Sequence, residues 1–124
     1  MKAIVSAMGP DVTAPIDQRF GRASHLVVVD TETGEWQAHP NPGATLDQGA
    51  GIEAARYAAE HGADAVITGM TGPNAFKTLA AAGIAVYSVA GGCVSEAIER
   101  FRTGFLDEVT EPSVDAHAGL RGNP

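Results

Sequence analysis

The sequence predicts an α/β domain in which about three helices cover a mixed five-stranded sheet. Short apolar runs rich in β-branched residues are bounded by Gly, Pro or Asp, a pattern typical of buried strands. Three helix-favouring segments end at Gly62, Gly83 and Gly104, which recur at equal intervals, and glycine is preferred at the left-handed position after a helix. This alternation of strands and helices predicts parallel strands joined by right-handed crossovers.

The first forty residues are expected to form the antiparallel part of the sheet. Residues 3–7 and 26–29 are apolar and β-branched, so we predict two buried strands. Residues 31–35 have the composition of a turn, and residues 36–39 follow as a third strand. The second and third strands are therefore expected to pair as a hairpin, with the first strand in the middle of the sheet.

The rest of the domain is expected to alternate between helices and strands. Ile52, Ala55 and Ala59 recur at helical spacing in an Ala-rich segment, whose small side chains allow close packing on a sheet. Pro73 stands where the first turn of a helix tolerates proline. We predict helices over residues 51–61, 73–82 and 94–102, separated by strands over 65–68 and 84–89.

Composition bounds the domain organisation and the partners. A chain of 124 residues with 44% hydrophobic residues has the size of one domain. We assign it to residues 1–106, and we expect residues 107–124 to form a flexible acidic tail because they carry few large apolar groups. A formal net charge of -7 argues against a nucleic-acid partner.

The single cysteine and the hydropathy pattern predict a cytoplasmic protein. Cys93 has no second cysteine with which to form an internal disulfide. The N-terminal apolar run is too short for a signal peptide, and no apolar stretch of about 18 residues is present. We therefore expect neither secretion nor membrane insertion.

Three loops are expected to meet at one end of the sheet, because ligands of open α/β sheets bind beyond the carboxyl ends of parallel strands. These loops span residues 6–22, 69–74 and 91–93. The last two are Gly-rich and open helices, so they offer backbone N–H groups to an anion. Taken alone, each loop is as compatible with a purely structural role as with anion binding, Gly72-Pro73 as a helix start and Gly92 as a tight turn. Two such loops at one end of the sheet favour anion binding.

Sulfur-containing and basic residues gather in the same loops. Met8, Met70 and Cys93 are soft donors that suit thiophilic metal centres, although such residues also serve as apolar filling. Arg19 and Arg22 flank two residues of the first loop and offer planar donor forks to an anion; the alternative is pairing with nearby aspartates. His25 is a further candidate metal ligand, and its alternative is a structural role at a strand start.

The sequence offers no catalytic constellation. It contains no His/Cys cluster at zinc-binding spacing, no phosphate-loop lysine and no Gly-x-Ser-x-Gly elbow. The first strand also lacks the carboxylates that two-metal nuclease chemistry requires. We therefore predict a binding protein and not an enzyme.

Several motifs, taken in order, resemble the dinitrogenase iron-molybdenum cofactor biosynthesis family, which includes nitrogenase cofactor carriers and molybdenum-copper orange proteins. The resemblance covers roughly residues 1–106 and implies a ribonuclease-H-like fold without nuclease carboxylates. The chain departs from the family pattern at Gln48, where some relatives have histidine, at Thr71 and at Cys93. The motifs that carry the resemblance are residues 20–25 leading into 27–30, then 49–52, 65–69, 72–76, 83–84 and 94–98.

The resemblance implies non-catalytic binding, transfer or protection of a molybdenum- or iron-containing sulfur cluster or its precursor, with cluster-donor or acceptor proteins as partners. The alternative is a metal-free regulatory or scaffold module that binds a partner protein or a small oxyanion at the same loops. Cys93 and His25 are the candidate metal ligands. The candidate cluster-binding residues are Ser6, Met8, Arg19, Phe20, Gly21, Arg22, Gly69, Met70, Thr71, Gly72, Asn74, Gly91 and Gly92.

Overall fold

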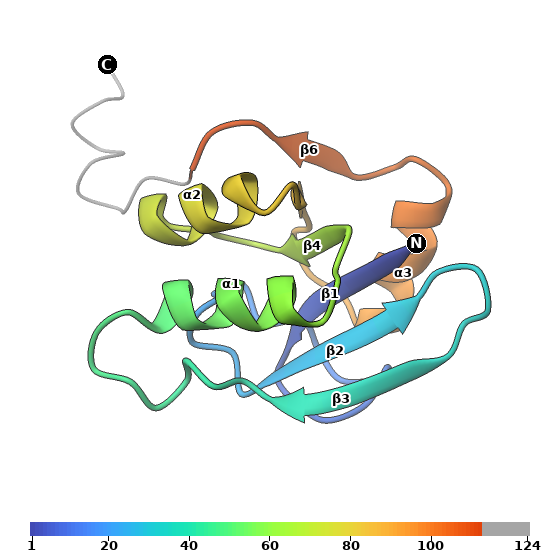
Figure 1. The fold of residues 1–124 in the computed structure, drawn as a ribbon. Helices are drawn as coiled ribbons and strands as arrows, with labels where there is room; N and C mark the ends of the chain where they lie inside the picture. The colour runs from blue at the N-terminus through green and yellow to red at the C-terminus, as the bar shows by residue number, and fades with distance from the viewer. Residues whose placement is uncertain (113–124) are drawn as a thin grey trace, which may run out of the picture.

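Over residues 1–112, which the computed structural model describes, the chain forms a mixed six-stranded sheet with three helices (Figure 1). The strand order is β3-β2-β1-β4-β5-β6. The elements are β1 (Lys2–Ala7), β2 (His25–Asp30), β3 (Trp36–Pro40), α1 (Ala50–Glu60), β4 (Ala65–Thr68), α2 (Pro73–Ala81), β5 (Ala85–Ser88), α3 (Val94–Arg102) and β6 (Asp107–Val109).

The first strand lies inside the sheet, as expected. β1 pairs antiparallel with β2, where Val5 faces Val27, and parallel with β4, where it faces Ile67. β2 and β3 form the expected hairpin, and β4 and β5 are parallel. The carboxyl ends of β1, β4 and β5 therefore lie at the same end of the sheet.

The sheet has one strand more than expected, because Asp107–Val109 pairs antiparallel with β5. Composition placed these three residues in a flexible tail. Their side chains are exposed apart from the half-buried Val109, so the strand is held mainly by backbone pairing, which leaves no apolar pattern in the sequence. Residues 110–112 follow β6 without helix or strand structure, and residues 113–124 of the expected tail lie outside the described residues.

Helices cover both faces of the sheet (Figure 1). Successive strand residues point to opposite faces, so Val5 packs with residues of α3, whereas Ile4 packs with residues of α1 and α2. All five residues from Ala3 to Ala7 are buried. β1 is thus covered on both sides, which explains its continuous apolar run.

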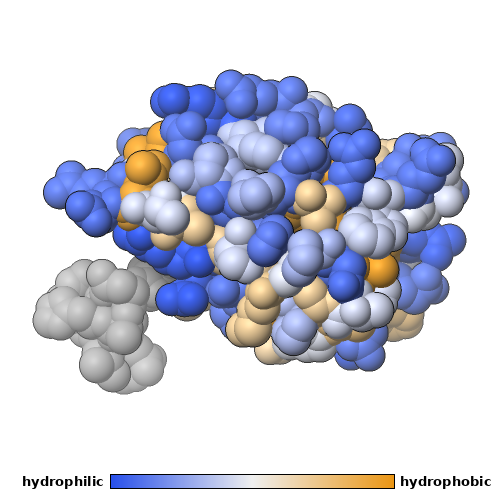
Figure 2. All heavy atoms as spheres, turned by 90° about the horizontal axis from the view of Figure 1, so that it is seen from below, coloured by the Kyte–Doolittle hydropathy of each residue, from blue (hydrophilic) through white to orange (hydrophobic). Residues whose placement is uncertain are grey.

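The outer surface is mainly hydrophilic on the face seen in Figure 2, where hydrophobic residues show only in small separate groups. That distribution agrees with the acidic composition. It gives this face no broad apolar area of the kind that marks a permanent protein interface.

The start of α3 gives a pH-dependent prediction. The carboxylate of Glu96 accepts a 2.9 Å hydrogen bond from the backbone N–H of Cys93, and this bond lowers the pKa of Glu96. A lowered folded-state pKa stabilises the fold above the unfolded-state value, about 4.3 for glutamate, and this contribution is lost as the pH falls through the folded-state pKa.

Replacing Glu96 with glutamine is therefore expected to lower stability near neutral pH, by an amount that shrinks as the solution is acidified below about pH 4. Urea unfolding at a series of pH values measures this difference. Glu60→Gln, at an exposed position of α1, is the control and should leave the pH profile close to that of the wild type. An equal profile for Glu96→Gln and wild type would show that the charge of the carboxylate does not stabilise the start of α3.

Candidate functional site

The loop between β1 and β2 runs across the end of the sheet and joins the other two loops. Backbone bridges connect Ala7 to Ile16, and Pro15 to Cys93. A further bridge connects Arg19 to Met70, where the N–H of Met70 donates to the carbonyl of Gln18. The three loops that the sequence predicted to meet at this end therefore do so.

A buried polar contact anchors this loop. The hydroxyl oxygen of Ser6 lies 2.7 Å from the carbonyl oxygen of Asp17 and 2.7 Å from the hydroxyl oxygen of Thr68. All three residues are buried, and buried polar groups are stabilised only when they are hydrogen-bonded. Ser6, which the sequence suggested as a cluster-binding residue, thus joins the loop to β1 and β4 in the structure.

A cavity of about 400 Å³ lies where the first loop meets the starts of α1 and α2. We call it the α1–α2 cavity. Its lining comes from three parts of the chain that are far apart in sequence. The lining residues are Arg19, Phe20, Gly21, Arg22, Asp47, Gln48, Gly49, Ala50, Gly51, Ile52, Met70, Gly72, Pro73, Asn74 and Ala75.

Two helix N-termini border this cavity. α1 follows Gly49 and α2 follows Gly72, and neither helix has a side-chain hydrogen bond at its cap. The N–H groups of a first helical turn have no partner within the helix, and the helix dipole places partial positive charge there. The two helix starts therefore favour an anion between them.

Close backbone contacts hold these segments together. A Cβ atom on Gly21 would lie 2.7 Å from the backbone nitrogen of Gly51, and a Cβ atom on Gly51 would lie 3.0 Å from the side-chain Cβ atom of Ala75. The Asn41 amide donates to the carbonyl of Phe20 at 3.1 Å, which holds the loop between β1 and β2 in place. Glycine is thus required at position 21 by close packing and not by an unusual backbone angle.

Two arginines supply positive charge to the cavity. The guanidinium of Arg22 donates to the backbone carbonyls of Leu46 and Asp47, and among the described residues it forms no ion pair with a carboxylate. Arg19 is 3.4 Å from a carboxylate oxygen of the buried Asp17, so part of its charge is offset. Asp47 is the one carboxylate residue among those that line the cavity.

The third loop does not contribute to this cavity, which differs from the expectation. The first N–H groups of α3 are already occupied: Val94 donates to the carbonyl of Ala14 at 3.1 Å, and Ser95 donates to that of Val12 at 2.9 Å. Gly91, Gly92 and Cys93 are absent from the cavity lining. The glycines there support a turn and a helix start.

The expected sulfur lining is only partly present. Met70 lines the cavity, while Met8 is 58% exposed outside the lining. The Cys93 sulfur lies 3.3 Å from the hydroxyl of Ser95, and the ring of His25 contacts Ser24. Over residues 1–112, no group of three or more His, Cys, Asp or Glu side chains is arranged to hold a metal ion.

The structure sorts the sequence candidates into two groups. Those in the cavity lining are Arg19, Phe20, Gly21, Arg22, Met70, Gly72 and Asn74. Those outside the lining are Ser6, Met8, His25, Gly69, Thr71, Gly91, Gly92 and Cys93.

Sequence reasoning missed the segment from residue 47 to residue 52 as part of the site. The signal was present, because Gly49-Ala50-Gly51 directly precedes an expected helix and belongs to the motifs of the family resemblance. The segment follows β3, which is antiparallel to its neighbour. It was therefore not expected at the end of the sheet where the parallel strands lead into their loops. The packing of α1 with α2, where Gly51 lies close to Ala75, brings the start of α1 to the cavity.

Comparison with known proteins identifies the family. Residues 1–104 match the family described as "Dinitrogenase iron-molybdenum cofactor". The chain belongs to this family. Its fold is accordingly the ribonuclease-H-like α/β arrangement that the resemblance implied, and membership links the chain to metal-cluster binding without showing which cluster it carries.

Solved structures of other proteins agree with this family assignment. The apo form of the orange protein from Desulfovibrio gigas is 40% identical, with a TM-score of 0.87 over 91% of this chain and 96% of that chain. A Thermotoga protein of the DUF35 family is 33% identical, with a TM-score of 0.81 over 93% of this chain and 98% of that chain.

A Methanocaldococcus jannaschii protein shares the fold at 19% identity, with a TM-score of 0.67 over 90% of this chain and 97% of that chain. No match was found among curated proteins. Within residues 1–112, none of the helices has the length and apolar character needed to cross a membrane.

Proposed function

We propose that this member of the dinitrogenase iron-molybdenum cofactor family is a non-catalytic carrier. Its cargo is an anionic molybdenum- or iron-containing sulfur cluster, or the precursor of one, held in the α1–α2 cavity. The observation that carries the proposal is the convergence of two helix starts and two arginines on one cavity. We further propose that the carrier acts in the cytoplasm and exchanges its cargo with donor and acceptor proteins.

Electrostatics support an anionic cargo. The whole chain has a formal net charge of -7, yet the charged residues that line the cavity are Arg19, Arg22 and Asp47. The cavity is thus locally positive within an acidic protein. Oriented N–H groups and guanidinium forks bind an anion through charge-assisted hydrogen bonds, which are the stronger class of hydrogen bond.

The same lining supports carriage more than catalysis. Its charged groups are two guanidinium groups, which remain protonated, and one exposed carboxylate. Among the described residues, no histidine, cysteine, lysine or tyrosine belongs to the lining, so this part of the chain offers the cavity no paired nucleophile and base of the kind that acid–base or covalent catalysis uses. Binding and release of a preformed anion require neither.

The proposal is tested by anaerobic purification from the native host, with metal analysis and a visible spectrum, followed by uptake of tetrathiomolybdate by the metal-free protein. We expect about one cluster per chain, and Arg22→Gln should weaken uptake by at least about tenfold, since a charge-assisted hydrogen bond contributes about 1.5–3 kcal/mol. Lys77→Gln, on the exposed side of α2, is the matched control for loss of one positive charge.

Two results would contradict the carrier proposal. Equal uptake by Arg22→Gln, Lys77→Gln and wild type would show that the cluster does not bind in the α1–α2 cavity. A colourless, metal-free protein that takes up neither thiomolybdate nor an iron-sulfur cluster would favour the metal-free module, which binds a partner protein or a simple oxyanion. Cys93→Ser is expected to retain uptake, because Cys93 lies outside the cavity lining.

A further inference from the structure

Three rings gather where β3 lies against the last turns of α1, outside the lining of the α1–α2 cavity. The centroid of the His39 ring is 5.5 Å from that of His61 and 5.8 Å from that of Tyr57. Tyr57 and His61 stack at 3.9 Å. Two of the three histidines among the described residues therefore meet at one place, although 22 positions separate them in the sequence.

Hydrogen bonds fix which ring nitrogens keep a free lone pair. Nδ1 of His61 lies 2.9 Å from the carbonyl oxygen of Tyr57. A carbonyl only accepts, so Nδ1 donates and the neutral ring keeps its lone pair on Nε2. Nε2 of His39 lies 3.2 Å from the amide oxygen of Gln37, which leaves the lone pair of that ring on Nδ1. Each imidazole thus has one nitrogen available and the other held, the arrangement found in metal-binding histidines.

The spacing of the two rings fits a shared metal ion. A zinc–nitrogen bond of about 2.0–2.1 Å places the ion about 3.2 Å from each ring centroid, and a tetrahedral angle then separates the two centroids by about 5.2 Å. The observed separation of His39 and His61 is 5.5 Å. Imidazole nitrogen is a preferred ligand of zinc, copper and nickel ions.

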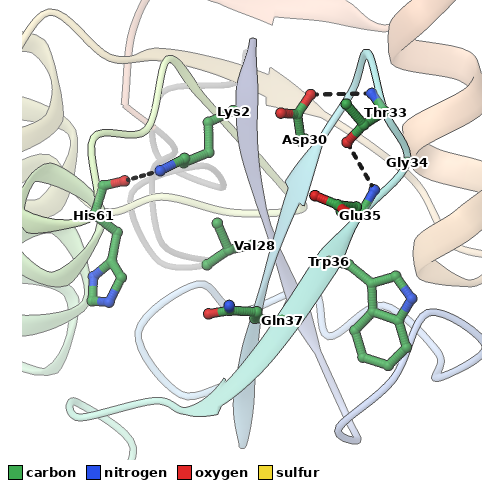
Figure 3. A pocket seen from close by; sticks show the side chains of 9 residues that line it. All are labelled: Lys2, Val28, Asp30, Thr33, Gly34, Glu35, Trp36, Gln37 and His61. Atoms are coloured by element: carbon green, nitrogen blue, oxygen red, sulfur yellow. Dashed lines mark hydrogen bonds between the residues drawn. The ribbon is translucent and has the colours of Figure 1, made fainter.

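The surroundings carry charges of both signs, since the ammonium of Lys2 donates a 3.0 Å hydrogen bond to the backbone carbonyl of His61 and two carboxylates line the adjacent pocket. His61 borders an open pocket of about 710 Å³ (Figure 3), whose charged lining residues are Lys2, Asp30 and Glu35. Figure 3 also shows the amide of Gln37 extending toward the side on which His61 lies. Among the described residues, the Tyr57 hydroxyl is the buried side-chain group that lacks a hydrogen-bond partner.

We propose that His39 and His61 together bind one divalent transition-metal ion of the imidazole-preferring class, represented by Zn²⁺, with water in the remaining positions. The ion joins the edge strand β3 to the end of α1. This site is independent of the proposed cluster carriage, because neither histidine lines the α1–α2 cavity.

Zinc titration of the full, metal-free chain by calorimetry tests the proposal. We expect saturation at one ion per chain, with affinity reduced at least about tenfold in His39→Gln and in His61→Gln, since even the outer partners of metal ligands contribute about 10–100-fold. His25→Gln and Cys93→Ser remove a histidine and a thiol elsewhere and should bind zinc as the wild type does. Uptake of tetrathiomolybdate by the two histidine variants should be unchanged, which separates this site from cluster carriage.

A second measurement needs no substitution. Addition of substoichiometric Cu²⁺ to the wild-type chain should broaden the ring resonances of His39, Tyr57 and His61 before those of the α1–α2 cavity. Zinc affinity that persists in both histidine variants, or copper broadening centred on His25 or Cys93, would overturn the proposal. The absence of saturable zinc binding to the wild type would overturn it as well and would leave the three rings as a packing cluster.

Discussion

Replacement of Phe20 with alanine is expected to lower the free energy of unfolding by about 3–5 kcal/mol. Phe20 is 1% exposed and is among the largest fully buried side chains. It belongs to the core cluster that packs β1 and β4 against α1 and α2, and it also lines the α1–α2 cavity. Truncation removes its buried apolar area and leaves a void beneath the site, and both effects destabilise the fold.

Urea unfolding monitored by circular dichroism measures this loss. Phe105→Ala is the matched control, because the Phe105 side chain is 79% exposed and surface substitutions usually change stability by less than about 0.5 kcal/mol. Similar losses for the two variants would contradict the assignment of Phe20 to the core. The Phe20 variant should also bind tetrathiomolybdate less well, since the loop that presents Arg19 and Arg22 rests on this ring.

Gly21→Ala is expected to abolish most cluster uptake and to lower stability by about 1–3 kcal/mol, the usual range for overpacking. The added Cβ atom would lie 2.7 Å from the backbone nitrogen of Gly51 and 2.9 Å from the Cα atom of Gly51. These are backbone atoms at the start of α1, so the clash is relieved only if the loop and the helix move apart. That movement separates Arg22 from the helix start with which it borders the cavity.

Gly91→Ala provides a control of the same chemical change. An added Cβ atom there meets nothing within 4 Å, and its backbone angle is one that other residues adopt. Uptake of tetrathiomolybdate and urea unfolding should therefore both remain close to the wild-type values. If Gly91→Ala impaired uptake as strongly as Gly21→Ala, the binding site would extend to the third loop, as the sequence first suggested.

Local patterns predicted most of the fold because they report local physics. The buried runs in β1 and β4 follow from periodicity and propensity, and the expected helix over 94–102 agrees with α3 in both bounds. The existence of α1 was also predicted, but its buried face contains Ala54 and Ala58, whereas Ala59 is exposed. β6 was missed because its pairing with β5 uses backbone groups and only Val109 is half-buried. Backbone pairing leaves no trace in a hydrophobicity pattern.

The site was predicted in part for a related reason. Arg19, Arg22 and Met70 were chosen because their residue types suit an anionic, sulfur-containing cargo, and all three line the α1–α2 cavity. Gly92 was also chosen, but the N–H groups that follow it bind carbonyls of residues 12 and 14. Whether the N–H groups at a helix start are free or already hydrogen-bonded depends on a loop that is distant in sequence, so composition does not reveal it.

By itself, the sequence determined the α/β class, the place of the first strand inside the sheet and the family, since each depends on the order of short local motifs. The tertiary structure decided which helix starts border a common cavity and which sulfur lies there. It also brought His39 beside His61, which no local spacing predicts. The physical reason is that these arrangements arise from packing between distant segments, where backbone contacts such as that of Gly21 with Gly51 set the distances.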